Sequence, residues 1–254
     1  MEHSPLTPLT PNLSEQPVAA DMDARDVKQV LVVTDAPRPA KAWTTYLNQL
    51  LRESAHALLA CRLVVLAEGA IVEPGTCDEH HPAIAELTTV AKMNNVIIAA
   101  GSMIEHEPGD PTASWHTCPL IGRDGLIGSC RKQGMESKTE RKIGVFTTPI
   151  GRIGILICLD IEDDALLSET AQNCDIVVNP SHIPHCGHGQ RLHALQPIHR
   201  RLQWWSLACG VSIVRCDHRP PMGMATSMVI TPCETWLKKA YESLRHPRRM
   251  PKGC

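Results

Sequence analysis

The stretch Arg152–Asp164, RIGILICLDIEDD, passes from an apolar run into a group of acidic residues. Its apolar part is short and is bounded by polar residues, as expected of a buried strand. Cys158 stands where this strand ends, and the acids Asp163 and Asp164 are typical of the first turn of a helix. The stretch therefore predicts a strand, a turn at Cys158 and then a helix.

Outward from this stretch, strands and helices alternate along the chain. Hydrophobic periodicity predicts strands at residues 27–35, 62–69, 96–105, 174–180, 211–216 and 223–232, and helices at residues 42–60, 83–95, 164–173 and 195–210. Turn residues predict hairpins over residues 115–132 and 144–158. Because hairpins are mixed with strand–helix–strand units, we expect an α/β or α+β domain built of packed layers.

Composition limits the classes of function. The chain has 254 residues, 43% of them hydrophobic, which is enough for a sizeable core. A formal charge of −2 predicts no general attraction to nucleic acid or to anionic membranes, and no apolar run has the length of a membrane helix. Eleven cysteines without a CxxC pair or a secretory leader indicate reduced thiols, so we expect a cytoplasmic protein.

Local amino-acid composition predicts that the chain has three parts. Residues 1–26 are rich in proline and lack an apolar core, which is typical of a disordered leader. Residues 27–232 contain all of the predicted strands and helices and form the expected domain. Residues 233–254 are rich in basic residues and lack the hydrophobic pattern of a strand, so we expect a C-terminal tail there.

Three residues at strand ends are candidates for chemistry. Cys158, at the start of a helix, would have backbone N–H groups nearby that stabilise a thiolate. Glu68 ends an apolar strand, where partial burial would let it accept a proton near neutral pH. Lys132 ends another and could neutralise charge in a pocket. Taken singly, each has an ordinary alternative: a packed cysteine, an exposed acid and a solvated lysine.

Considered together, the three residues support one another. Each lies at the carboxyl end of a predicted strand, the edge of an open α/β sheet at which sites gather. The segments RLVVLAEG, DGLIGSCRK and TPIGRIGILICLD, in this order, resemble the Glu, Lys and Cys motifs of the nitrilase or carbon–nitrogen hydrolase superfamily. The resemblance extends through CDIVVNPS, HRRLQWWSLACGVSIVR and GMATSMVITP, so that it covers residues 27–232.

The resemblance implies a four-layer α-β-β-α sandwich and a mechanism without metal or cofactor. Glu68 matches the general base, Lys132 the lysine on the oxyanion side and Cys158 the nucleophile, with an acyl-thioester intermediate. Further residues are carried over as substrate-binding or supporting groups: Glu140 as a pocket glutamate, with Glu136 as the weaker alternative, Leu159 through its N–H, Asp160, and His182, with His185 as its alternative, beside the substrate. The implied substrate is a small amide or nitrile.

Several readings of function remain open. CLD resembles the CYD of amidases more than the CWE of nitrilases, which favours an amidase. An N-acyltransferase with the same triad is the alternative within the superfamily. An inactive regulatory or scaffold homologue is the alternative of another class, because the segment between Lys132 and Cys158 is shorter than in most members and Cys130 replaces their usual tyrosine.

Two further features of the sequence bear on binding. His182, His185 and His188 lie close together, but the intervening proline and glycines indicate a loop without helical ligand spacing, so we predict no metal site. Trp204 and Trp205 are adjacent on a predicted helix, so one of them must face away from its apolar stripe. Such an exposed tryptophan is consistent with a homo-oligomer, as the family implies.

Overall fold

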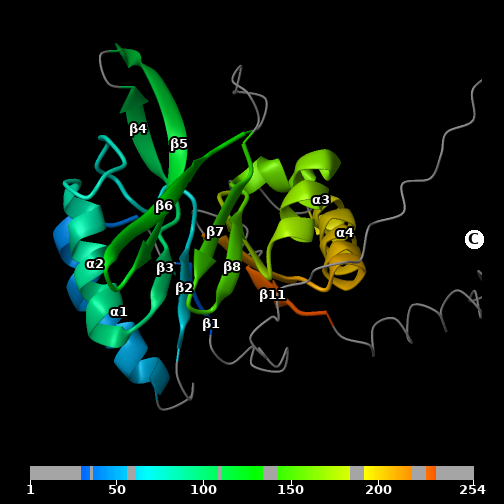
Figure 1. Ribbon diagram of the computed structural model, residues 1–254, viewed down its shortest axis with the longest axis horizontal. Coiled ribbons are helices and arrows are strands. Elements are labelled where there is room, and N and C mark those ends of the chain that lie inside the picture. Colours follow the sequence, from blue (N-terminus) through cyan, green and yellow to red (C-terminus); the bar gives the residue numbers. More distant parts are fainter. Residues whose placement is uncertain are drawn as a thin grey trace, which may run out of the picture.

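The computed structural model describes residues 30–34, 37–55, 61–107, 110–133, 142–183, 192–218 and 227–232. The predicted leader and C-terminal tail lie outside these residues, as do Glu136, Glu140, His185 and His188. In the described part, two sheets face each other and helices cover both outer faces (Figure 1).

The first sheet has the strand order β1-β2-β3-β5-β4, with β6 paired to the other edge of β5. Its strands are β1 (Val30–Val33), β2 (Leu63–Leu66), β3 (Ile97–Ala99), β4 (Met103–Glu107), β5 (Asp110–Gly122) and β6 (Gly125–Arg131). The first three are parallel, and β5 and β6 form the predicted hairpin, although β5 begins before Trp115. Parallel pairing places the ends of β2 and β3 at the same edge.

The second sheet has the order β11-β10-β9-β8-β7. Its strands are β7 (Gly144–Thr148), β8 (Gly151–Ile155), β9 (Ile176–Ser181), β10 (Ser212–Asp217) and β11 (Met228–Ile230). The three central strands are parallel, and the predicted hairpin forms β7 and β8. The carboxyl ends of β8, β9 and β10 therefore meet at one edge.

Helices complete the four layers. α1 (Ala40–Ala55) and α2 (Pro82–Asn94) cover the first sheet, while α3 (Asp164–Asn173) and α4 (Leu192–Cys209) cover the second (Figure 1). One core cluster lies between each pair of layers, and the central cluster joins Val65 of β2 to Ile155 and Val178 of the second sheet. The predicted α-β-β-α sandwich is confirmed.

The faces of α4 follow its sequence pattern. Ile198, Leu202 and Trp205 recur at helical spacing and pack against the core beneath α4. Trp204 is 58% exposed, so the expected division between the two tryptophans is confirmed. In the described part of the chain, no helix combines the length and the apolar character needed to cross a membrane.

One predicted strand is interrupted. Residues 96–105 were expected to form a single strand, but they form β3 and β4, which both pair with β5. The break is at Gly101, whose φ of +74° is in the left-handed region. A Cβ there would lie 2.1 Å from the carbonyl oxygen of Ala67. This close approach lets Ser102 Oγ accept a hydrogen bond from Gly69 N at 2.8 Å, which steadies the turn that carries Glu68.

We expect Gly101→Ala to lower the free energy of unfolding by about 3 kcal/mol, because it combines a left-handed conformation with a backbone clash. Gly210 is a matched control, since its φ is +67° but a Cβ there would meet nothing within 4 Å. Gly210→Ala should cost only about 1 kcal/mol. Urea unfolding of both variants measures the difference. An equal loss of unfolding free energy in the two variants would contradict a role for the close approach of Gly101 to the carbonyl of Ala67.

Candidate active site

The turn at Cys158 has an uncommon backbone conformation. Cys158 opens the 3₁₀ helix η2 (Cys158–Glu162), which follows β8 and precedes α3, and its φ is +51°. A left-handed conformation is rare for a residue with a side chain and persists only where the surroundings hold it. Asp160 accepts a hydrogen bond from Ile157 N at 3.1 Å, and Asn179 Nδ2 donates to the carbonyls of Leu156 at 2.7 Å and Cys158 at 3.2 Å. These bonds hold the turn on both sides of Cys158.

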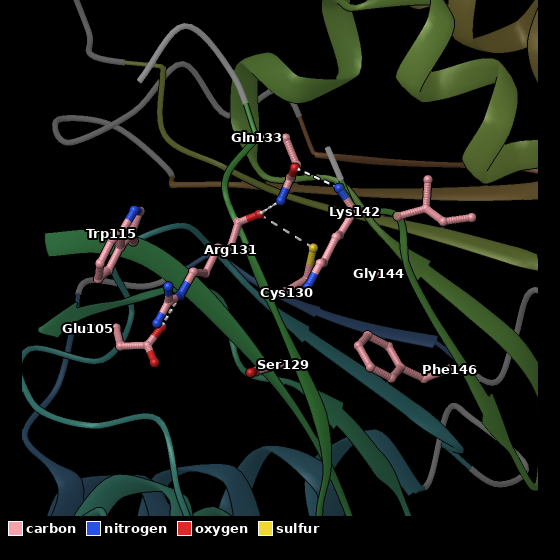
Figure 2. Close-up of a pocket in the computed structure, with 10 residues that line it drawn as sticks. Glu105, Trp115, Ser129, Cys130, Arg131, Gln133, Lys142, Gly144 and Phe146 are labelled. Atoms are coloured by element: carbon pink, nitrogen blue, oxygen red, sulfur yellow. Dashed lines mark hydrogen bonds and ion pairs between the residues drawn. The ribbon is translucent and has the colours of Figure 1, made fainter. Parts of the chain in front are cut away.

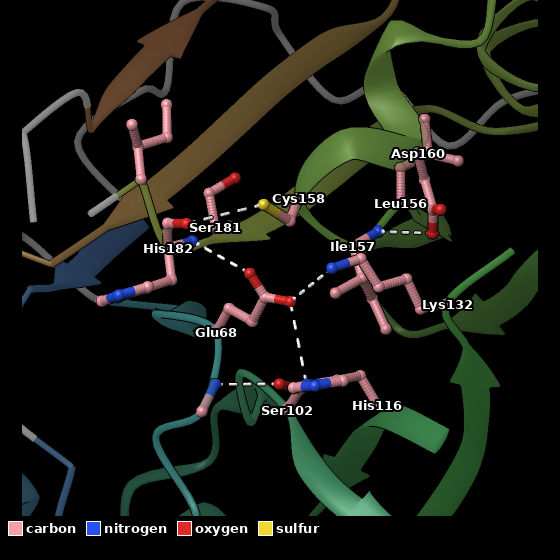
Figure 3. A network of polar contacts seen from close by, with 12 residues as sticks. Glu68, Ser102, His116, Lys132, Leu156, Ile157, Cys158, Asp160, Ser181 and His182 are labelled. Atoms are coloured by element: carbon pink, nitrogen blue, oxygen red, sulfur yellow. Dashed lines mark hydrogen bonds and ion pairs between the residues drawn. The ribbon is translucent and has the colours of Figure 1, made fainter. Parts of the chain in front are cut away.

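The structure brings Glu68, Lys132 and Cys158 together from three distant segments. Lys132 Nζ donates to Glu68 Oε1 at 2.9 Å, and this ion pair is largely buried. The Glu68 carboxylate lies between Lys132 and Cys158 (Figure 3). Cys158 Sγ lies 3.7 Å from the backbone oxygen of His182, to which it donates. The three residues thus come together from both sheets, with Glu68 and Lys132 following strands of the first and Cys158 following a strand of the second.

Backbone and ring contacts orient the Glu68 side chain, which is 6% exposed. Glu68 Oε2 accepts a hydrogen bond from His182 N at 3.1 Å, so its two oxygens have different partners (Figure 3). His116 Nδ1 lies 3.8 Å from Oε1. On the backbone, Glu68 N donates to Ser181 O, and Glu68 O lies 2.7 Å from His218 Nε2. The carboxylate is therefore held in place beside the thiol.

The electrostatics of Cys158 require a base at its side. Burial, as the largest cause, and the negative charge of Glu68 together raise the pKa of the Cys158 thiol to about 11, although the backbone of His182 and the charge of Lys132 act to lower it. At neutral pH the thiol is therefore protonated. A thiol in this state becomes an effective nucleophile only if a neighbouring group accepts its proton during attack. Glu68 is a carboxylate in the right place to do so.

Asp160 connects the Cys158 turn to the end of β6. Its carboxylate accepts hydrogen bonds from Gln133 N at 3.0 and 3.1 Å, in addition to the bond from Ile157 N. Because Gln133 follows Lys132 directly, Asp160 sets the position of the lysine relative to the cysteine. The side chain of Leu159 is 56% exposed, and its N–H belongs to the first turn of η2, where backbone donors point away from the helix.

The acids that follow have the predicted structural role. Asp163 is the N-cap of α3 and accepts hydrogen bonds from Ala165 N and Leu166 N. Asp164 forms an ion pair with Arg201 at 2.7 Å. Neither belongs to the group around Cys158, so the acidic run divides into Asp160 at the site and two acids at the start of α3, the N-cap Asp163 and the ion-paired Asp164.

The remaining predicted site residues have different outcomes. Glu140 and its alternative Glu136 lie outside the described residues. His182 is at the site, but through its backbone atoms, while its ring packs edge-on against His218 at 5.2 Å. Within the described part, no group of three or more His, Cys, Asp or Glu side chains is arranged to hold a metal ion.

Sequence reasoning missed several residues around the site. Asn179 is a polar residue inside the buried strand β9, and a polar side chain in an apolar run is a signal that the sequence offered. Arg215 is a charged residue within the apolar segment VSIVRC, which is also a signal. The sequence contains no signal for His116 and His218, because their proximity to Glu68 depends on how β5 and β10 are placed in the two sheets.

A pocket of about 560 Å³ lies beside this group, and neither Glu68, Lys132 nor Cys158 lines it. Arg131 stacks on the Trp115 ring at 3.9 Å and pairs with Glu105 at 2.9 Å on one side, while Phe146 forms the other side (Figure 2). The lining residues are Glu105, Trp115, Ser129, Cys130, Arg131, Gln133, Lys142, Ile143, Gly144 and Phe146. The pocket is therefore separate from the three candidate catalytic residues.

Comparison with solved structures supports the fold. The protein Nit3 of Saccharomyces cerevisiae, a member of branch 10 of the nitrilase superfamily, has a TM-score of 0.64 at 19% identity, covering 80% of this chain and 82% of that one. A carbon–nitrogen hydrolase from Helicobacter pylori G27 has a TM-score of 0.66 at 15% identity, with 80% of each chain covered.

A third similar structure is a mutant of the amidase from Nesterenkonia sp. AN1, in which acrylamide has added to the active-site cysteine. Its TM-score is 0.59 at 13% identity, covering 80% of this chain and 84% of that one. A comparison with curated protein sequences gives no match. The family model described as carbon-nitrogen hydrolase matches residues 27–210. The chain therefore belongs to the carbon–nitrogen hydrolase family.

Proposed function

We propose that this protein is a cysteine-dependent amidase that hydrolyses a small, non-peptide amide through an acyl-thioester. The observation that carries the proposal is the position of Glu68, which contacts Lys132 at 2.9 Å and raises the pKa of the protonated Cys158 thiol. A base, a cation and a nucleophile meet there in a buried place, which is the arrangement that acyl transfer needs.

In the proposed reaction, Cys158 Sγ attacks the amide carbon while its proton passes to Glu68. The negative oxygen that develops is stabilised by Lys132 and by the N–H of Leu159. The proton then moves from Glu68 to the nitrogen as the carbon–nitrogen bond breaks, so that an amine or ammonia leaves. Water next gives a proton to Glu68 and attacks the thioester, which releases the carboxylic acid and restores the thiol.

The choice of an amidase rests on two supports. Cys158-Leu159-Asp160 resembles the amidase motif, and Asp160 accepts hydrogen bonds from two backbone N–H groups, those of Gln133 and Ile157. The Nesterenkonia amidase is a structural neighbour with a reactive active-site cysteine. We further propose a cytoplasmic location, since the cysteines in the described part of the chain are free thiols.

The proposal is tested by trapping the intermediate. We expect a panel of small aliphatic amides to include a substrate that releases ammonia and, after rapid acid quenching, leaves an acyl group on Cys158 in peptide mass spectrometry. Cys209→Ala removes a partly exposed thiol away from the site and should leave both signals unchanged. Adding amine acceptors tests the acyltransferase alternative, because transfer would give a new amide instead of the acid.

Two outcomes would contradict hydrolysis at this site. Acylation spread over several cysteines would indicate general thiol reactivity rather than a catalytic Cys158. A panel that yields neither ammonia nor any acyl-enzyme would instead favour the regulatory or scaffold homologue.

A further inference from the structure

A buried arginine lies beneath the Cys158 turn. Arg215, on β10, is 2% exposed, and it is directly opposite Asn179 in the parallel pairing of β10 with β9. Burying a guanidinium is costly unless its charge and its hydrogen bonds are used. An apolar residue would fit the pattern of β10 better, so the arginine calls for a reason beyond packing.

The contacts of Arg215 lead to the nucleophile in two steps. Arg215 Nη1 donates to Asn179 Oδ1 at 2.6 Å, and Ser181 Oγ donates to the same oxygen at 2.8 Å. These two donors fix the amide so that its nitrogen faces the carbonyls of Leu156 and Cys158. A flipped amide would set its N–H groups against the guanidinium donors. Arg215 therefore determines which way Asn179 points.

Asn179 in turn holds the left-handed turn. The carbonyls on both sides of Ile157 are bound by one amide group, and the φ of Cys158 is +51°. A conformation of this kind persists only where neighbouring groups over-determine it. Asp160 accepts a hydrogen bond from Ile157 N, so Asp160 and Asn179 together hold the turn in place.

Charge gives Arg215 a second effect. Burial is the main cause that lowers the pKa of Arg215, and among the charges that oppose this, Cys158 comes first, followed by Asp217, Glu162 and Glu68. Interaction between two sites is reciprocal, so a positive Arg215 favours the thiolate form of Cys158. Lys132 acts on the thiol in the same direction.

We propose that Arg215 is a positioning residue of the active site, which holds the Cys158 turn through Asn179 and supplies buried positive charge that stabilises the thiolate. The catalytic consequence rests on the proposed function, but the effect on the thiol does not. The described hydrogen bond of Arg215 reaches the Cys158 turn through Asn179, so its action is measured on Cys158 itself.

The test compares Arg215→Lys, which keeps the charge, with Arg215→Gln, which keeps a hydrogen-bond donor for Asn179 but loses the charge. Each full-length variant is alkylated with iodoacetamide at one mildly alkaline pH, and peptide mass spectrometry follows Cys158 against the partly buried Cys61 and Cys209 as internal references. We expect Arg215→Gln to slow alkylation of Cys158 about tenfold, which corresponds to a rise of about one unit in its pKa. Arg215→Lys should stay within about threefold of the parent protein.

Arg201→Gln is the matched control, since Arg201 on α4 is a partly exposed arginine paired with Asp164 and bonded to Glu162 O. It should leave the Cys158 rate unchanged. Equal rates in the lysine and glutamine variants, or a faster rate with glutamine, would overturn the proposal. Failure of the parent protein to hydrolyse any amide would sink the proposed function while leaving this comparison valid, because alkylation requires no turnover.

Discussion

Cys158→Ala is expected to abolish amide turnover while leaving the fold intact. The side chain is 6% exposed and contributes one sulfur atom, and alanine meets the same backbone conformation at φ +51°. Without the sulfur no acyl-enzyme forms, and neither Glu68 nor Lys132 can replace it as nucleophile. We expect the rate to fall by about 10⁴-fold or more, the usual consequence of losing a covalent nucleophile.

The measurement is kcat/KM for an amide identified in the panel, together with the urea midpoint of each variant. Cys209→Ala serves again as the control and should keep the activity of the parent protein. Full activity in Cys158→Ala would exclude Cys158 as the nucleophile. A large loss of stability would show instead that the thiol is a structural group.

Glu68→Gln is expected to change turnover and thiol acidity in opposite senses. Loss of the general base should slow amide hydrolysis by about 10²–10⁴-fold. The negative charge of Glu68 is one of the causes that raise the pKa of Cys158 to about 11, so its removal lowers that pKa, leaving burial as the main opposing cause and Lys132 as a favourable one. More thiolate is then present at any given pH below the midpoint.

The two effects are separated by measuring turnover and the pH dependence of Cys158 alkylation in the same preparation. We expect slower hydrolysis, with an alkylation midpoint that moves below about 11. Glu53→Gln on α1 is the control, because Glu53 is exposed and bonds only to Gln49 among the contacts described. If both rates fell together in Glu68→Gln, the residue would be acting on the fold of the site rather than as a base.

Local pattern was enough to predict much of the architecture. The helix over residues 164–173 was expected and forms α3 within those bounds, because apolar spacing and an acidic start act locally. The hairpin β7–β8 was likewise predicted from its turn residues and its flanking apolar runs. The break at Gly101 was missed, since its cause is the carbonyl of Ala67 on a neighbouring turn, which no local pattern reports.

The candidate site also has features that the sequence predicted and features that it did not. Glu68, Lys132 and Cys158 each follow an apolar strand, so their strand-end positions could be predicted. Glu68 and Lys132 follow strands of the first sheet and Cys158 follows a strand of the second, so their meeting depends on the packing of the two sheets. The backbone role of His182 was not predictable, because its N–H and carbonyl reach Glu68 and Cys158 only after the two sheets have packed face to face.

By itself, the sequence determined the order of strands and helices, the residues at their ends and the family to which they belong. Tertiary structure alone decided that Glu68 contacts Lys132, that Asn179 and Arg215 lie beneath the Cys158 turn, and that the pocket beside Arg131 excludes the three candidate catalytic residues. The physical reason is the range of the interactions. Periodicity and capping act within a few residues, whereas burial, charge and hydrogen bonding at the site join segments that meet only when both sheets are in place.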